Sequence, residues 1–176
     1  MKMKNILRNV TVGLLMALGT VSCKKDETVT APSLDSKTFN YAFNTGQIDA
    51  SFAYDGQHAS NLSGDLKLEE QESGKTKITF TLKNTVNGET YNIHAHDAAD
   101  ASTTPNGTPY NETPNGDVFV QQIMGNGGSV STSTISSKTF KELTTSYSGF
   151  FVVHDPLQAV STTNPKTFVI LGLFAR

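Results

Sequence analysis

Two of the chain's four histidines stand two residues apart, at His94 and His96 in the stretch "YNIHAHD". In a β-strand successive side chains point to opposite faces, so residues i and i+2 stand side by side. Two imidazoles on one face are able to bind one metal ion. His154, far along the chain at the end of the apolar run "GFFVVHDP", supplies a third imidazole. Three imidazoles form a ligand set that suits copper or zinc at neutral pH.

The segments that carry these histidines alternate apolar and polar residues, as is typical of half-buried antiparallel strands. Tyr91, Ile93 and Ala95 share one face of their segment. His94 and His96 therefore occupy the opposite face and are expected to point outward from the core. Eight such segments predict an all-β, antiparallel sandwich or barrel. The expected strands are 46–55, 63–71, 76–84, 90–96, 117–123, 129–135, 148–154 and 166–175.

The N-terminus has the features of a secretory signal. Residues 1–22 begin with positive charges and continue with an apolar run from Val10 to Val21, too short to span a bilayer as a mature helix. Cys23, the only cysteine, follows "LGTVS", and this stretch resembles a bacterial lipobox. The resemblance implies lipid attachment at Cys23 and a protein anchored to a membrane of the bacterial cell envelope. The alternative is an ordinary signal peptide followed by a free or buried thiol.

The remaining chain divides into a tether and a domain. Residues 23–38 are polar and include Pro32, as expected of a flexible tether, and residues 39–176 form the predicted domain. Removal of residues 1–22, with their three positive charges, changes the formal charge from −2 to −5. Nothing in this composition suggests nucleic-acid binding. A single cysteine excludes an internal disulfide, so stability must come from the core or from a metal.

Four stretches within residues 63–176 occur in a characteristic order. They are "SGDLKLEEQESGKTKITFTLKNTVNGETYNIHAHD", "GTPYNETPNGDV", "SGFFVVHDP" and "FVILGLFA". They resemble the second to fourth strands, the end of the zinc loop, the strand of the last copper histidine and the closing strand of the copper/zinc superoxide dismutases. The resemblance implies a Greek-key sandwich or barrel of the superoxide dismutase type, with copper as cofactor.

Residue by residue, the resemblance assigns copper ligation to His94, His96 and His154. The family's fourth copper ligand is a histidine that bridges copper and zinc. It is missing from this chain, because Pro109 or Tyr110 occupies its place. The three retained histidines are those that hold the reduced ion in the family, so the resemblance implies that Cu(I) is still bound.

Other positions of the motifs also depart from the family. Water, Asp97 or Asp155 is expected to complete the coordination of Cu(II). Zinc is not expected in the family's zinc site, because Pro114 stands where a zinc histidine would be and only Asp117 matches a zinc ligand. Lys166, in "NPKTF", takes the place of the active-site arginine and is expected to guide an anion as a point charge.

These features predict a copper-binding, superoxide dismutase-like lipoprotein that converts superoxide to peroxide and dioxygen. Two alternatives remain open: a non-catalytic sandwich module for adhesion or complex assembly, and a copper carrier. A third is zinc in the three-histidine site with an open water position, as in hydrolytic zinc enzymes. His58, in "DGQHASN", matches no ligand and is expected to be an exposed loop residue.

Overall fold

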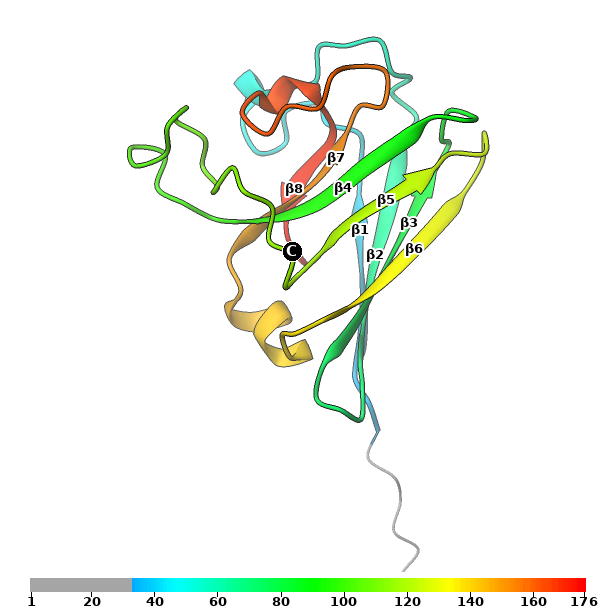
Figure 1. Cartoon of the computed structure of the whole chain (residues 1–176), viewed down its shortest axis with the longest axis vertical. Helices are drawn as coiled ribbons and strands as arrows, with labels where there is room; N and C mark the ends of the chain where they lie inside the picture. The colour runs from blue at the N-terminus through cyan, green and yellow to red at the C-terminus, as the bar shows by residue number, and fades with distance from the viewer. Residues whose placement is uncertain (1–32) are drawn as a thin grey trace, which may run out of the picture. The chain divides into compact units, whose positions relative to one another are not determined.

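Eight antiparallel strands form two sheets in residues 33–176, the part of the chain that the computed structural model describes (Figure 1). One sheet has the order β1-β2-β3-β6 and the other β5-β4-β7-β8. The predicted signal peptide, Cys23 and the first part of the tether lie outside the described residues. The strands are β1 Ser36–Tyr41, β2 Ser63–Glu70, β3 Thr76–Lys83, β4 Thr90–Asp97, β5 Val120–Met124, β6 Val130–Ser136, β7 Gly149–His154 and β8 Phe168–Leu173.

The connections between the sheets follow a Greek-key path. The chain crosses from β3 to β4, returns from β5 to β6, and crosses again from β6 to β7. β6 thereby lies beside β3, and the edges of β5 and β6 meet where Thr132 donates a hydrogen bond to Gln121 (3.3 Å). The all-β antiparallel prediction is confirmed, with the architecture of a sandwich. The two sheets do not close into a barrel.

Seven of the eight predicted strands coincide with observed ones, and the first is wrong. The strand expected at 46–55 is a loop that contains the short 3₁₀ helix η1 (Ala50–Phe52), preceded by Gly46 at a φ of 87°. The first strand is β1, where Phe39 and Tyr41 alternate into the core. β1 begins within the stretch predicted as tether. The prediction missed it because only two buried positions distinguish it from a polar linker.

The main core lies between the sheets and is centred on Phe151 of β7. Its ring packs against Phe80 of β3 and Tyr41 of β1, with ring centroids 4.7 and 5.1 Å away. Gly64 of β2 makes room for this packing, because a Cβ atom there would lie 2.2 Å from the Phe80 ring. Alternate residues of β3 and β4 are buried in this core, and in β4 they include Tyr91, Ile93 and Ala95, which the alternation predicted to share one face.

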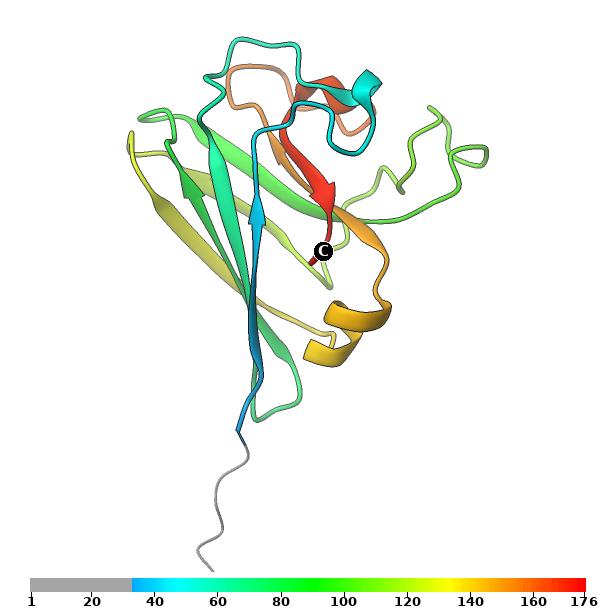
Figure 2. The ribbon, with the colours of Figure 1, turned by 180° about the vertical axis from the view of Figure 1, so that it is seen from behind.

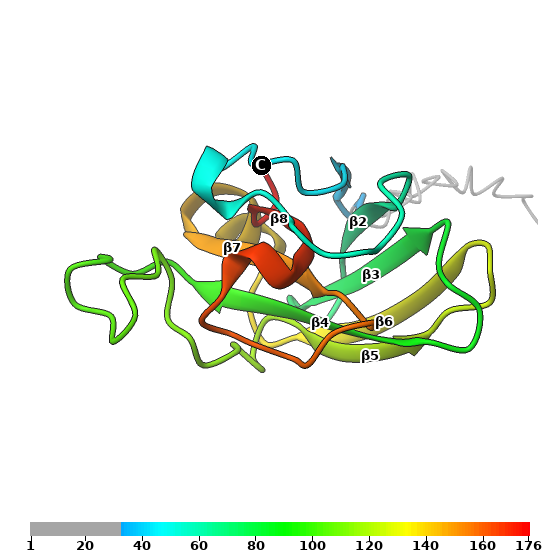
Figure 3. The same ribbon diagram turned by 90° about the horizontal axis from the view of Figure 1, so that it is seen from above.

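A second apolar cluster lies on the outer face of the β5-β4-β7-β8 sheet. Its fully or nearly fully buried members come from β7, β8 and the loop after β4, and Ile48 and Phe52 pack against them. Loops 42–62 and 155–167 lie together at one end of this sheet (Figures 2 and 3), and the hydrogen bond from Asp55 N to Lys166 O joins them. The cluster consists of Tyr110, Phe150, Val152, Phe168 and Leu171.

Short helical turns complete the connections. η2 (Glu142–Ser146) is a π-helical turn between β6 and β7, and η3 (Pro165–Thr167) is a 3₁₀ turn that leads into β8. Within residues 33–176, no helix has the length and apolar character needed to cross a membrane.

Candidate metal centre

Three histidines from β4 and β7 meet on the outer face of the second sheet. His94 pairs with Val152 across the two strands, and His154 stands two residues beyond Val152 on the same face. A register shift between β7 and β8 falls between Val153 and His154, where β8 has one extra residue. His94 and His96 therefore face away from the main core, as predicted.

His94 lies close to both of the other histidine rings. The ring centroid of His94 lies 5.0 Å from that of His154 and 5.8 Å from that of His96. A nitrogen about 2 Å from an ion puts its ring centre about 3 Å away, so ligand rings at trigonal or tetrahedral angles lie about 5 to 5.5 Å apart. His94 thus neighbours both other rings at close to the spacing that shared coordination needs.

Four of the six nitrogens of these rings are buried without partners. In residues 33–176, five buried side-chain nitrogen or oxygen atoms lack a hydrogen bond, and four of them belong to this cluster. Most buried polar atoms in proteins are hydrogen-bonded, because an unpaired one retains its desolvation penalty. The four atoms are Nδ1 of His94, Nε2 of His96 and both ring nitrogens of His154.

A backbone carbonyl sets the tautomer of His96. Its Nδ1 lies 2.8 Å from the carbonyl oxygen of Asn111. A carbonyl only accepts hydrogen bonds, so Nδ1 carries the proton and Nε2 presents a free lone pair. The same arrangement, a ligand imidazole held by a carbonyl through its other nitrogen, orients histidines in metal sites.

Burial keeps all three imidazoles neutral at pH 7. Desolvation, with the neighbouring His96, lowers the pKa of His94 to about 4. Desolvation, followed by the charges of His94 and His96, lowers the pKa of His154 to about 3. Desolvation also lowers the pKa of His96, against the hydrogen bond to Asn111. Neutral imidazole is the form that coordinates a metal.

Aromatic side chains cover the cluster, which the sequence analysis did not foresee. The Tyr110 ring lies 5.1 Å from the His96 ring, and the Phe168 ring lies 4.8 Å from the His154 ring. Both aromatic residues are fully buried, and the Tyr110 hydroxyl donates to the Thr162 carbonyl (3.0 Å). His96 is 0% exposed and His154 1% exposed. His96 and His154 thus face a second apolar cluster instead of solvent, whereas His94 is partly exposed.

Asp155, one residue beyond His154, takes part in a different network. Its carboxylate accepts hydrogen bonds from the Tyr54 hydroxyl, from Gln158 Nε2 (2.8 Å) and from Leu157 N (2.9 Å). The Tyr54 hydroxyl in turn accepts from His58 N (2.8 Å). This network attaches loop 42–62 to the end of β7.

His58 is buried at 6% exposure, so the prediction of an exposed loop residue is wrong. Its Nε2 lies 2.7 Å from the Tyr91 hydroxyl and its Nδ1 lies 2.9 Å from the Ala59 carbonyl. Its loop folds back onto β4, and no local pattern in "DGQHASN" indicates that contact. Because both ring nitrogens have partners, His58 is a structural histidine.

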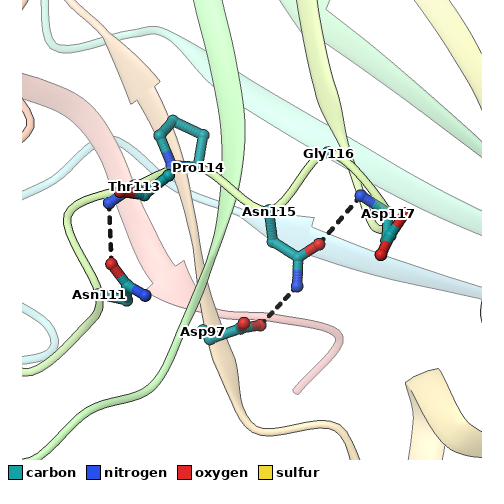
Figure 4. A pocket seen from close by; sticks show the side chains of 7 residues that line it. All are labelled: Asp97, Asn111, Thr113, Pro114, Asn115, Gly116 and Asp117. Carbon is teal, nitrogen blue, oxygen red and sulfur yellow. Dashed lines mark hydrogen bonds between the residues drawn. The ribbon is translucent and has the colours of Figure 1, made fainter.

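The remaining predicted residues occupy two different places. The Lys166 side chain is half exposed, and its Nζ lies 4.0 Å from Asp55 Oδ2. Asp97 accepts a hydrogen bond from Asn115 Nδ2 (2.7 Å) in an open pocket of about 440 Å³ that Asp117 also lines (Figure 4). No histidine lines this pocket.

The ring nitrogens of the three histidines suit a metal ion chemically, but the three rings do not have the arrangement of a metal site. No group of three or more His, Cys, Asp or Glu side chains in residues 33–176 already has the arrangement of a metal site. The donor atoms themselves suit the ion, since each histidine has an unpaired, buried nitrogen. The His94–His96 spacing of 5.8 Å exceeds the 5 to 5.5 Å expected of two ligands of one ion, so these two rings would have to move closer to hold it.

The fold and the cluster define an all-β sandwich with three neighbouring neutral imidazoles on the outer face of one sheet, of which His96 and His154 are buried and His94 is partly exposed. Comparison of the chain with protein-family models, curated proteins and solved structures finds no match.

Proposed function

We propose that this chain is a copper-binding, superoxide dismutase-like lipoprotein of the bacterial cell envelope, in which His94, His96 and His154 hold the ion. One observation carries the proposal: four unpaired buried nitrogens of the described residues belong to these three neighbouring rings. Neutral imidazole suits copper, and the carbonyl partner of His96 orients its free nitrogen toward the cluster face. Bound copper would supply one-electron redox chemistry.

Dismutation of superoxide is the activity that the family resemblance implies. The chain's own contributions would be three neutral ligands and an aromatic cover that limits water. Lys166 would attract the anion, and its half-exposed side chain leaves the ammonium accessible. Its nearest carboxylate, on Asp55, offsets part of that attraction.

A copper carrier is the second candidate, and the surroundings of the cluster favour it. Tyr110, one of the two residues that the family resemblance places at the position of the fourth ligand, packs on His96. Its hydroxyl is engaged with the Thr162 carbonyl. A site with three ligands and no fourth side chain binds an ion without supplying the proton that peroxide release requires.

The test is copper loading of the metal-depleted protein, read by bound copper per chain and by melting temperature. Wild type is expected to bind one copper and to melt at higher temperature, because a ligand of the folded state alone stabilises it. His154→Gln should lose both effects. His58→Gln is the matched control, since His58 is also buried but has partners on both nitrogens. No copper uptake at micromolar concentration would refute the proposal, and a superoxide assay of the loaded protein separates enzyme from carrier.

A further inference from the structure

The sandwich is closed along one side and open along the other. On the closed side the edge strands β5 and β6 are joined by the hydrogen bond from Thr132 to Gln121. On the other side the edge strands are β1 and β8 (Figure 2), and within residues 33–176 no ladder of main-chain hydrogen bonds joins them. A side chain links them instead, since the Tyr41 hydroxyl donates to the Leu173 carbonyl (2.9 Å).

The register of β8 determines which of its main-chain groups point into this opening. The Phe174 N–H donates to the Gly149 carbonyl (2.8 Å), and hydrogen-bonded pairs alternate along an antiparallel ladder. Leu171 and Leu173 therefore direct their N–H and C=O groups away from β7. The Leu173 carbonyl accepts from Tyr41, but in the described part of the chain the N–H of Leu173 and both main-chain groups of Leu171 have no protein partner.

β1 presents the same kind of edge to the opening. The Glu70 N–H donates to the Asp35 carbonyl (2.8 Å), so by the same alternation Ser36, Thr38 and Asn40 direct their main-chain groups away from β2. Such an edge is a template for an added strand unless charged residues, proline or a bulge block it. The sequence of β8, "FVILGL", contains neither a charged residue nor a proline.

A pocket of about 230 Å³ lies between the two edges. Asn40 of β1 lines it on one side, Leu171 and Leu173 of β8 line it on the other, and Ile48 adds an apolar wall. The Leu173 side chain is 47% exposed. An extended polypeptide is the ligand that satisfies both features, because its main chain pairs with the strand edge while an apolar side chain packs against the leucines.

Arg176 is the only charged residue among those that line this pocket. A guanidinium has five N–H donors, and that of Arg176 makes three hydrogen bonds, to the carbonyls of Thr144 (3.3 Å), Ala175 (2.9 Å) and Tyr147 (3.0 Å). Two donors therefore remain, and no acidic side chain lines the pocket. Charge complementarity favours an occupant that carries a carboxylate beside its apolar residue.

We propose that the opening between β1 and β8 binds an extended segment of a partner protein, which adds to the free edge of β8 and places a carboxylate on Arg176. The segment alternates apolar and polar residues, because successive side chains of a strand face opposite sides. It is short, because Asn44 already donates to the Val169 carbonyl (2.9 Å) and closes one end of the edge. This interaction goes beyond copper binding and does not depend on the proposed copper site.

The test uses a capped six-residue peptide that alternates valine and threonine and ends in aspartate, titrated into the purified full-length chain by fluorescence anisotropy. Leu173→Pro removes an edge N–H that β7 does not use and is expected to weaken binding at least ~10-fold, whereas the control Leu173→Val keeps the N–H and should bind within ~2-fold of wild type. Arg176→Gln should weaken binding of this peptide and leave binding of a matched asparagine peptide unchanged. Bound peptide should protect the amides of Leu171 and Leu173 from hydrogen exchange.

Each contrary result overturns a stated part of the proposal. Equal binding by folded Leu173→Pro and Leu173→Val proteins excludes the β8 edge as the site, and no binding at millimolar concentration overturns the proposal as a whole. If Leu173→Pro does not fold, a backbone N-methylated peptide takes its place, since it keeps the side chains, lacks main-chain donors and should bind at least ~10-fold less tightly. Dimerisation of the chain alone through this edge, lost in Leu173→Pro, would assign the opening to a second copy and overturn the partner peptide.

Discussion

Lowering the pH from 7 to 5 is expected to destabilise the metal-free protein by about 2 kcal/mol through His154 alone. The pKa of His154 is about 3 in the folded state, because the ring is buried beside His94 and His96. In the unfolded chain it returns to about 6.5. Between these values the unfolded state binds a proton that the folded state does not. The stability present above pH 6.5 is therefore lost progressively as the pH falls toward 3.

The magnitude follows from the interval between the unfolded pKa and the final pH. About 1.5 pH units separate 6.5 from 5, and each unit corresponds to about 1.4 kcal/mol per proton. His94 acts in the same direction with its pKa of about 4, but its partly exposed ring is screened by solvent and contributes less. Carboxylates titrate mainly below this range, so they add little between pH 7 and 5.

The assay is urea unfolding followed by circular dichroism at pH 7, 6 and 5, with a chelator to keep metal away. His154→Gln removes the titrating ring, so the free energy of unfolding of this variant should fall by about 2 kcal/mol less than that of wild type between pH 7 and 5. His58→Gln, outside the cluster, should retain the wild-type contribution of His154. If His154→Gln and wild type lose the same free energy of unfolding, the burial argument for this histidine is wrong.

Three further predictions concern other parts of the domain. Tyr54→Phe removes a hydrogen bond to the buried Asp155 carboxylate and should reduce the free energy of unfolding by about 1.5–3 kcal/mol. A loss below about 0.5 kcal/mol would show that the carboxylate finds another partner. Gly64→Ala puts a Cβ 2.2 Å from the Phe80 ring and should reduce the free energy of unfolding by about 1–3 kcal/mol, which lowers the melting temperature by several degrees. In the control Gly116→Ala the added Cβ meets no atom within 4 Å, so this variant should melt like wild type. Lys166→Gln should change the free energy of unfolding by less than about 1 kcal/mol, because the ion pair of Lys166 is exposed. If the copper-loaded protein is active, the variant should react with superoxide more slowly than wild type at low salt only. A variant that reacts as fast as wild type at all salt concentrations would contradict the guiding role of Lys166.

The strands were predictable because their burial pattern is local. In β3 every second residue is buried, and all of these except Thr76 are apolar. In β4 the apolar and buried Tyr91, Ile93 and Ala95 alternate in the same way, and a period of two places His94 and His96 on the other face whatever their environment. The end of β7 at His154 was also predictable, because Pro156 has no backbone N–H group to donate to the strand ladder. β1 was missed because its only buried residues, Phe39 and Tyr41, follow a polar stretch that looks like tether.

The cover of the cluster was not predictable, because it depends on contacts between distant loops. Tyr110 reaches His96 from a connection without regular structure, and its hydroxyl meets Thr162 of another loop. The burial of His58 likewise requires its loop to contact Tyr91. Alternation reports which face a side chain takes, and it contains no information about which loop covers that face.

The burial of the cluster has a cost that links its stability to its chemistry. Each unpaired buried polar atom costs about 1–3 kcal/mol, and the cluster has four of them. Their sum is comparable with the whole stability of about 5–15 kcal/mol that a domain usually retains. An ion bound to the free nitrogens offsets this cost in the folded state alone, since the unfolded chain does not bring residues 94 and 154 together. The burial of these atoms therefore destabilises the empty cluster, and an ion held by the proposed site would offset that cost.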